Sequence, residues 1–183
     1  MDEKQTIKQY LENDQSKENR DAIIDFVGDD TGRLGHLMEM FLDTDLHWRY
    51  NQRAAWPIGV LGRKKPYLIN PYLSRMVNLL GPGNHDAVNR NILRILEDLD
   101  VHEDLEGIVF DKCYNFLNDP DYSIAIRAFS MTVLFNIASK YPETLPELYE
   151  SIQLHLPYGS TGFKNRGNKI LLKIEKILSN IQE

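Results

Sequence analysis

The sequence predicts an all-α fold, a short solenoid of about five stacked antiparallel helix pairs that forms one domain over residues 1–183. Three observations lead to this prediction. Strand signals are nearly absent, because no stretch sustains a period-two alternation and no Asn-Gly or Asp-Gly hairpin occurs. Apolar residues recur at helical spacing along most of the chain. An arginine returns every 33 to 39 residues, once in every second predicted helix.

The breaks between the helices are marked by proline, glycine and asparagine. Pro66 and Pro142 can each occupy a first helical turn. The segments 81–83, 118–120 and 157–159 interrupt the helical pattern. All connections are short, and short connections favour antiparallel neighbours.

The apolar spacing between these breaks defines the helices in order. We expect helices near residues 2–12, 16–27, 31–42, 46–62, 66–80, 85–99, 102–118, 121–140, 142–156 and 162–181. Two apolar stripes are especially regular, namely Leu68, Tyr72, Met76 and Leu79, and Ile170, Ile174, Ile177 and Ile181.

The recurring arginine lies near the start of each second helix and precedes an apolar run. An isolated buried guanidinium costs on the order of several kcal/mol unless it is paired and hydrogen-bonded, so its recurrence predicts a structural partner in each repeat. The five positions, at spacings of 33, 37, 37 and 39 residues, are Arg20, Arg53, Arg90, Arg127 and Arg166. A polar residue stands six positions before each arginine: Asp14, His47, Asn84, Asp121 and Ser160.

This pattern resembles the HEAT repeat, which belongs to the armadillo-like class of α-solenoids. The best single match covers residues 118–128, with weaker copies around Arg53 and Arg90. The resemblance implies a ladder of hydrogen bonds between neighbouring second helices, with Asp121 and Arg127 as members. The other four recurring arginines would be its remaining members.

Charge is distributed in blocks of alternating sign. The net charge is −6. Residues 1–45 carry −7, residues 46–94 carry +7, residues 95–160 carry −9 and the remainder carries +3. The overall negative charge argues against a nucleic-acid partner, whereas the second block favours an acidic one.

The stretch 47–67 is the strongest candidate for a binding surface. It mixes cations with aromatic side chains, which can hold carboxylate or phosphate and stack on a partner. The predicted contact residues are Arg49, Trp56, Arg63, Lys64 and Lys65. A structural interpretation stays open, because the tryptophan suits a core and the two lysines suit a helix C-terminus.

We therefore predict a non-catalytic scaffold or adaptor that binds a protein, with an acidic segment, on its concave face. The alternative is a nucleic-acid-binding protein similar to the HEAT-like DNA alkylation repair glycosylases. The segment 159–169 faintly resembles the serine-lysine-asparagine loop of adenylosuccinate lyases through Ser160 and Lys164, but the Met-Pro pair of that loop is missing. On this basis we predict no lyase activity, and we would interpret an assignment of this chain to the lyases as a misannotation.

No cofactor or metal site is predicted. The acidic loop 97–106 matches no calcium-loop spacing, and the histidines form no HExxH pair. The single cysteine, Cys113, lies in a half-buried helical pattern and is predicted to be structural. No run approaches the ~20 apolar residues of a membrane span, so we expect a soluble cytoplasmic protein.

Overall fold

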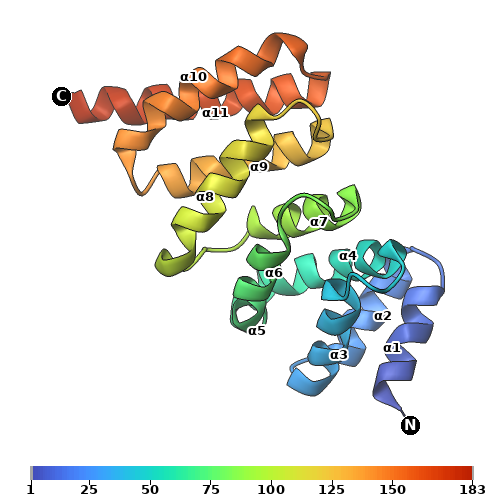
Figure 1. The fold of residues 1–183 in the computed structure, drawn as a ribbon. Coiled ribbons are helices and arrows are strands. Elements are labelled where there is room, and N and C mark those ends of the chain that lie inside the picture. Colours follow the sequence, from blue (N-terminus) through green and yellow to red (C-terminus); the bar gives the residue numbers. More distant parts are fainter. Residues whose placement is uncertain (1, 183) are drawn as a thin grey trace. The chain divides into compact units, whose positions relative to one another are not determined.

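The computed structural model describes residues 2–182, and within this range the chain forms α-helices and short 3-10 turns without a strand (Figure 1). The predicted all-α fold is therefore confirmed. The chain divides into two compact units, one ending at Asp100 and the other beginning at Val101. That residues 1–183 act as one domain stays a prediction.

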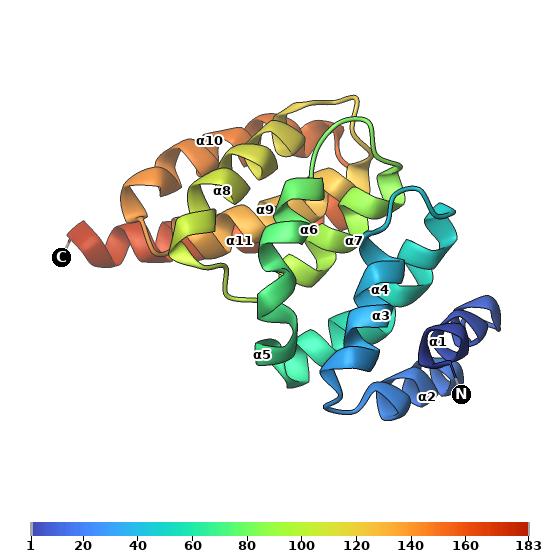
Figure 2. The same ribbon diagram turned by 60° about the horizontal axis from the view of Figure 1, so that its bottom comes forward.

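The first unit consists of three helix pairs in two layers (Figure 2). Its elements are α1 (Glu3–Glu12), α2 (Lys17–Val27), α3 (Thr31–Leu42), α4 (Trp48–Lys64), α5 (Pro66–Ile69), η1 (Asn70–Tyr72), α6 (Leu73–Leu79) and α7 (Asp86–Leu96). In one layer α3 packs between α1 and α6, and in the other α4 packs between α2 and α7. The first helix of each pair therefore lies in one layer and the second helix in the other.

The second unit repeats this arrangement with two pairs. Its elements are α8 (Glu103–Asn118), α9 (Ile124–Ala138), η2 (Pro142–Thr144), α10 (Leu145–His155), η3 (Leu156–Tyr158) and α11 (Thr161–Gln182). α8 contacts α10 in one layer, and α9 contacts α11 in the other. The described residues thus form the five predicted helix pairs, three in one unit and two in the other.

Local sequence explains where most helices begin. The carboxylates of Asp2 and Asp30 and the hydroxyl of Ser16 accept hydrogen bonds from first-turn N–H groups of α1, α3 and α2. His47 and His85 do the same through Nδ1 at the starts of α4 and α7. These side chains satisfy donors that have no partner within the helix.

One predicted helix, 66–80, is interrupted in the structure. The chain runs from α5 through the 3-10 turn η1 into α6. Pro71 lies within that turn, and a proline has no N–H to donate while its ring crowds the carbonyl four residues earlier. The interruption therefore follows from one residue, and the apolar side chains of Leu68, Leu73 and Met76 are still buried.

All five recurring arginines lie on second helices. Arg20 is in α2, Arg53 in α4, Arg90 in α7, Arg127 in α9 and Arg166 in α11. Their common place in the repeat agrees with the even spacing seen in the sequence. Because second helices share a layer within each unit, these side chains start from equivalent positions.

The partners of these arginines differ from repeat to repeat. Arg53 and Arg127 donate to backbone carbonyls, those of Leu11 at 2.6 Å and Leu117 at 3.0 Å. Arg166 donates to the hydroxyl of Thr132 at 2.6 Å, which joins the two second helices α11 and α9. These bonds give three of the guanidinium groups a structural role.

The predicted ladder partner Asp121 has another contact. Its backbone N–H donates a hydrogen bond to Oδ1 of Asp119 at 2.9 Å. Arg20 pairs with Asp21, its neighbour in the sequence. A continuous ladder of aspartate and arginine between neighbouring second helices stays a prediction.

The thiol of Cys113 is completely buried in the second unit. Burial raises its pKa to about 12. Because the thiolate is the reactive form of cysteine, this side chain acts as a small apolar residue in the folded protein.

Asn118 connects the end of α8 to α10. Its Oδ1 accepts a hydrogen bond from Ser151 at 2.8 Å and lies 3.0 Å from Nε2 of His155. Burial lowers the pKa of His155, and the positive charge of Arg127 lowers it further. The folded protein therefore favours the neutral imidazole at this position.

We expect the stability of the protein to fall as the pH drops below about 6.5, in part through His155. The unfolded chain binds a proton there more readily than the folded chain, so the contribution of His155 is present above that pH and is lost below it. His155→Gln should reduce the fall in melting temperature between pH 7 and pH 5. The exposed His102, replaced by glutamine, serves as the control, and an equal fall in parent and His155→Gln would contradict the assignment.

Candidate functional site

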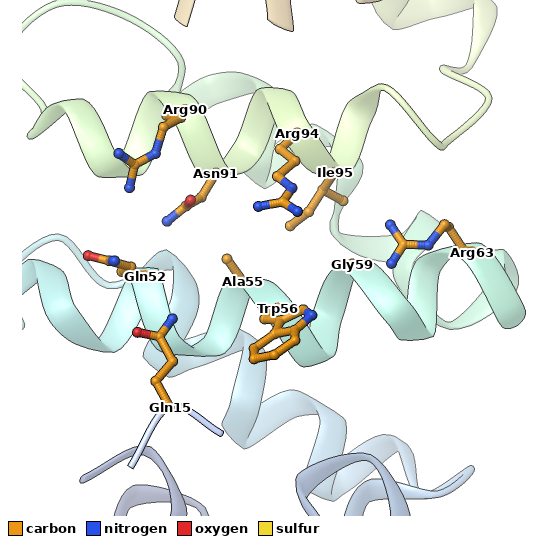
Figure 3. A pocket seen from close by; sticks show the side chains of 10 residues that line it. All are labelled: Gln15, Gln52, Ala55, Trp56, Gly59, Arg63, Arg90, Asn91, Arg94 and Ile95. Atoms are coloured by element: carbon orange, nitrogen blue, oxygen red, sulfur yellow. The ribbon is translucent and has the colours of Figure 1, made fainter. Parts of the chain in front are cut away.

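A groove of about 510 Å³ lies between α4 and α7 in the first unit (Figure 3). These two helices are neighbours in the layer of second helices. The groove is lined by Gln15, Gln52, Ala55, Trp56, Gly59, Arg63, Arg90, Asn91, Arg94 and Ile95. The lining contains three arginines and no carboxylate, so its charge is positive although the chain as a whole is negative.

Arg90 and Arg94 form the α7 side of the groove. They are four residues apart, one turn of helix, and Figure 3 shows both side chains extending from α7 toward α4. Neither forms a side-chain hydrogen bond or an ion pair with any residue in the described range 2–182. Like charges at this spacing repel each other by a few tenths of a kcal/mol, roughly, so the pair suits an anionic ligand better than an empty groove.

Trp56 and Arg63 form the α4 side. The guanidinium of Arg20 lies over the indole of Trp56, 4.6 Å from the ring centroid, and this contact holds the ring against the groove. Arg63 extends from the last turns of α4 and donates to the carboxylate of Asp98 at 2.7 Å. Both partners of this ion pair are well exposed to solvent, so the pair is weak and can open.

Two buried asparagines hold the floor of the groove in place. Asn91 is 6% exposed and donates through Nδ2 to Oδ1 of Asn51 at 2.9 Å. Asn51 is 2% exposed and donates to the carbonyl of Phe41 at 2.7 Å. This chain of bonds runs from the end of α3 through α4 to α7, and it fixes the separation of the two helices that border the groove.

The structure brings two of the five predicted contact residues, Trp56 and Arg63, into this groove. Arg49, Lys64 and Lys65 lie outside its lining. That these five residues contact a partner stays a prediction.

The other three have surroundings of their own. The guanidinium of Arg49 lies 5.7 Å from the ring centroid of Trp48. Lys64 is exposed at the end of α4. Lys65 donates to Asp29 at 2.6 Å, and the hydrogen bonds from Lys65 and Tyr67 lower the pKa of that carboxyl.

Arg94 and Asn91 were not predicted as site residues from the sequence, and Arg90 was predicted to have a structural role alone. The sequence held one signal for the first, because two arginines at i and i+4 place two like charges one helical turn apart, but Asp86, Glu97 and Asp98 at helical spacing from them concealed it. The asparagine gave no such signal.

Two further features were sought in the described range 2–182, a cluster of metal ligands and a membrane-spanning helix. No three histidine, cysteine or acidic side chains gather as metal ligands there. None of the helices described is long and apolar enough to cross a bilayer. Ser160 of the lyase-like segment accepts a hydrogen bond from the N–H of Phe163 at 3.3 Å, which places it as a cap in the first turn of α11.

Helix pairs stacked in two layers, with a regular residue pattern in every second helix, define an α-helical repeat protein. The model of the HEAT repeat domain matches residues 7–174, and the chain therefore belongs to the HEAT repeat domain family. The resemblance seen in the sequence is thereby confirmed.

The chain was also compared with curated proteins and with solved structures. A search of curated proteins found no match. Among solved structures, the chain is similar to the "Crystal Structure of MAST/Orbit N-terminal domain". The identity is 18%, the alignment covers 94% of this chain and 82% of that one, and the TM-score is 0.49.

Proposed function

We propose that this protein is a non-catalytic protein-interaction module that binds an acidic segment of its partner in the groove between α4 and α7. Membership of the HEAT repeat domain family supports the general role, because helical repeats offer extended surfaces for protein partners. The observation that carries the proposal is the pair Arg90 and Arg94, two guanidinium groups without an ionic partner in the described chain.

The composition of the groove supports a protein ligand. Trp56 offers an aromatic surface beside the arginines, and tryptophan and arginine are the residue types that contribute most to protein interfaces. The net charge of −6 would repel a polyanion at long range, whereas a short acidic segment meets chiefly the local positive charge. Nucleic-acid binding through the same arginines is the alternative, and it would show as a steep loss of affinity with added salt.

The test is affinity capture from an extract of the source cells, followed by measurement with the purified partner. We expect Arg90→Glu combined with Arg94→Glu to weaken binding by about 100-fold or more, because two attractive contacts become repulsive. Arg75→Glu is the matched control, since Arg75 is an exposed arginine on α6 outside the groove.

The two outcomes are easily separated. Both variants should remain folded, because neither change breaks an ion pair in the described chain, although the double variant should melt somewhat lower since its glutamates lie one helical turn from Asp86, Glu97 and Asp98. A partner that binds the double variant as tightly as the parent would show that the groove is not its binding site.

A further inference from the structure

We infer that the acidic group recognised by Arg90 and Arg94 is a phosphoryl group on a serine or threonine of the partner segment. The inference rests on the proposed function and makes it more specific. It is carried by the number, type and spacing of the charges that line the groove.

The groove offers more positive charge than a single carboxylate can balance. Arg90 and Arg94 contribute two guanidinium groups that form no ion pair within the described residues, and the lining has no carboxylate of its own. One carboxylate offers a single charge and two oxygens. A phosphorylated side chain carries roughly −1.5 to −2 at neutral pH and three acceptor oxygens, so one group can balance both guanidinium groups.

The spacing of Arg90 and Arg94 along α7 also fits a phosphoryl group. Residues at i and i+4 on a helix have Cβ atoms roughly 5 to 6 Å apart, so two long arginine side chains can reach one tetrahedral anion between them. A guanidinium presents its donors as a planar fork that matches phosphate oxygens in pairs. The groove uses arginine for all its cations and contains no lysine, which is the composition expected where paired hydrogen bonds matter as well as charge.

Neutral donors and an apolar surface complete the site. Gln15 and Gln52 also line the groove, and their amides are able to donate to a phosphoryl oxygen or to the ligand backbone. Trp56, held by Arg20, provides a fixed surface for a side chain next to the phosphorylated residue. Arg63 adds a third positive charge when its exposed pair with Asp98 opens.

The experiment uses three pools of degenerate nonapeptides that share flanking positions and carry phosphoserine, glutamate or serine at the centre. Binding is followed by the fluorescence of Trp56 in the full chain with Trp48→Phe, so that one indole reports. We expect the phosphoserine pool to bind at least about tenfold more tightly than the glutamate pool, and the serine pool to bind most weakly.

Two variants test the role of the guanidinium forks. Arg90→Lys combined with Arg94→Lys keeps both charges and removes the forks, so it should lose most of the preference for phosphoserine over glutamate. Arg75→Lys on α6 is the matched control and should retain the preference. Loss of the preference in the control as well would overturn the assignment to these two residues.

The remaining outcomes separate the two proposals. Equal binding of the glutamate and phosphoserine pools would overturn the phosphoryl inference. The proposal that the groove binds an acidic segment would then still hold. Failure of all three pools to bind would overturn both. Binding of inorganic phosphate or of a single-stranded oligonucleotide at least as tight as that of the phosphoserine pool would also overturn the inference, because the groove would then recognise the anion without the peptide.

Discussion

Arg127→Ala is expected to lower the free energy of unfolding by about 2 to 4 kcal/mol, the scale of leaving a buried partner without its charged group. The side chain is 8% exposed, and its Nε donates to the carbonyl of Leu117 at 3.0 Å. That carbonyl lies in the last turn of α8, where it has no partner within its own helix. Burial lowers the pKa of Arg127, while the charge of Asp119 acts in the opposite direction.

The arginine also provides packing that alanine would remove. Its guanidinium lies 5.6 Å from the ring centroid of the buried Phe163, so it covers an aromatic face in α11 while it bonds to α8. Chemical denaturation of the parent and of Arg127→Ala measures the effect. Arg127→Lys separates charge from shape, because lysine keeps the charge and lacks the Nε donor. Identical unfolding curves for the parent and Arg127→Ala would show that the bond contributes nothing.

Asn51→Leu is expected to lower the free energy of unfolding by about 2 to 4 kcal/mol, because it leaves two buried polar groups without partners. The first is the carbonyl of Phe41 near the end of α3, and the second is the side-chain amide of Asn91 in α7. Leucine is similar in size, so lost hydrogen bonds dominate over lost volume. The exposed Asn78 on α6, replaced by leucine, is the control and should change stability by less than roughly 0.5 kcal/mol.

A double-mutant cycle tests whether the two asparagines act together. Asn51→Leu combined with Asn91→Leu removes both members of the pair, so the double variant should be more stable than the sum of the single effects implies. Replacing both partners by apolar groups avoids stranding either of them. Strict additivity would indicate that the 2.9 Å bond between the two side chains does not couple them.

Most helix boundaries could be predicted because their determinants are local. Ser16 and Asp30 stand directly before helices that begin at Lys17 and Thr31, as capping predicts. The expected helix 66–80 failed at Pro71, which the apolar spacing around it concealed. The apolar spacing predicts which side chains are buried, and those side chains stay buried at helical spacing on both sides of Pro71.

The candidate site was less predictable because its parts are distant in the sequence. Trp56 and Arg63 belong to the basic and aromatic stretch, but Arg90 and Arg94 come from a helix that begins more than twenty residues later. Which lysines remain available was not predictable either, since Lys65 meets Asp29 from a connection between two earlier helices. A backbone acceptor such as the carbonyl of Leu117 could not be predicted from the sequence, because every residue has a carbonyl whatever its side chain.

The buried thiol of Cys113 can report local opening of the second unit. A thiol-specific alkylating reagent reaches this sulfur only in molecules whose α8 has separated from its neighbours, so the labelling rate in native buffer measures how often that opening occurs. Comparison of labelling with the global unfolding rate would reveal whether α8 opens alone or only when the entire unit melts.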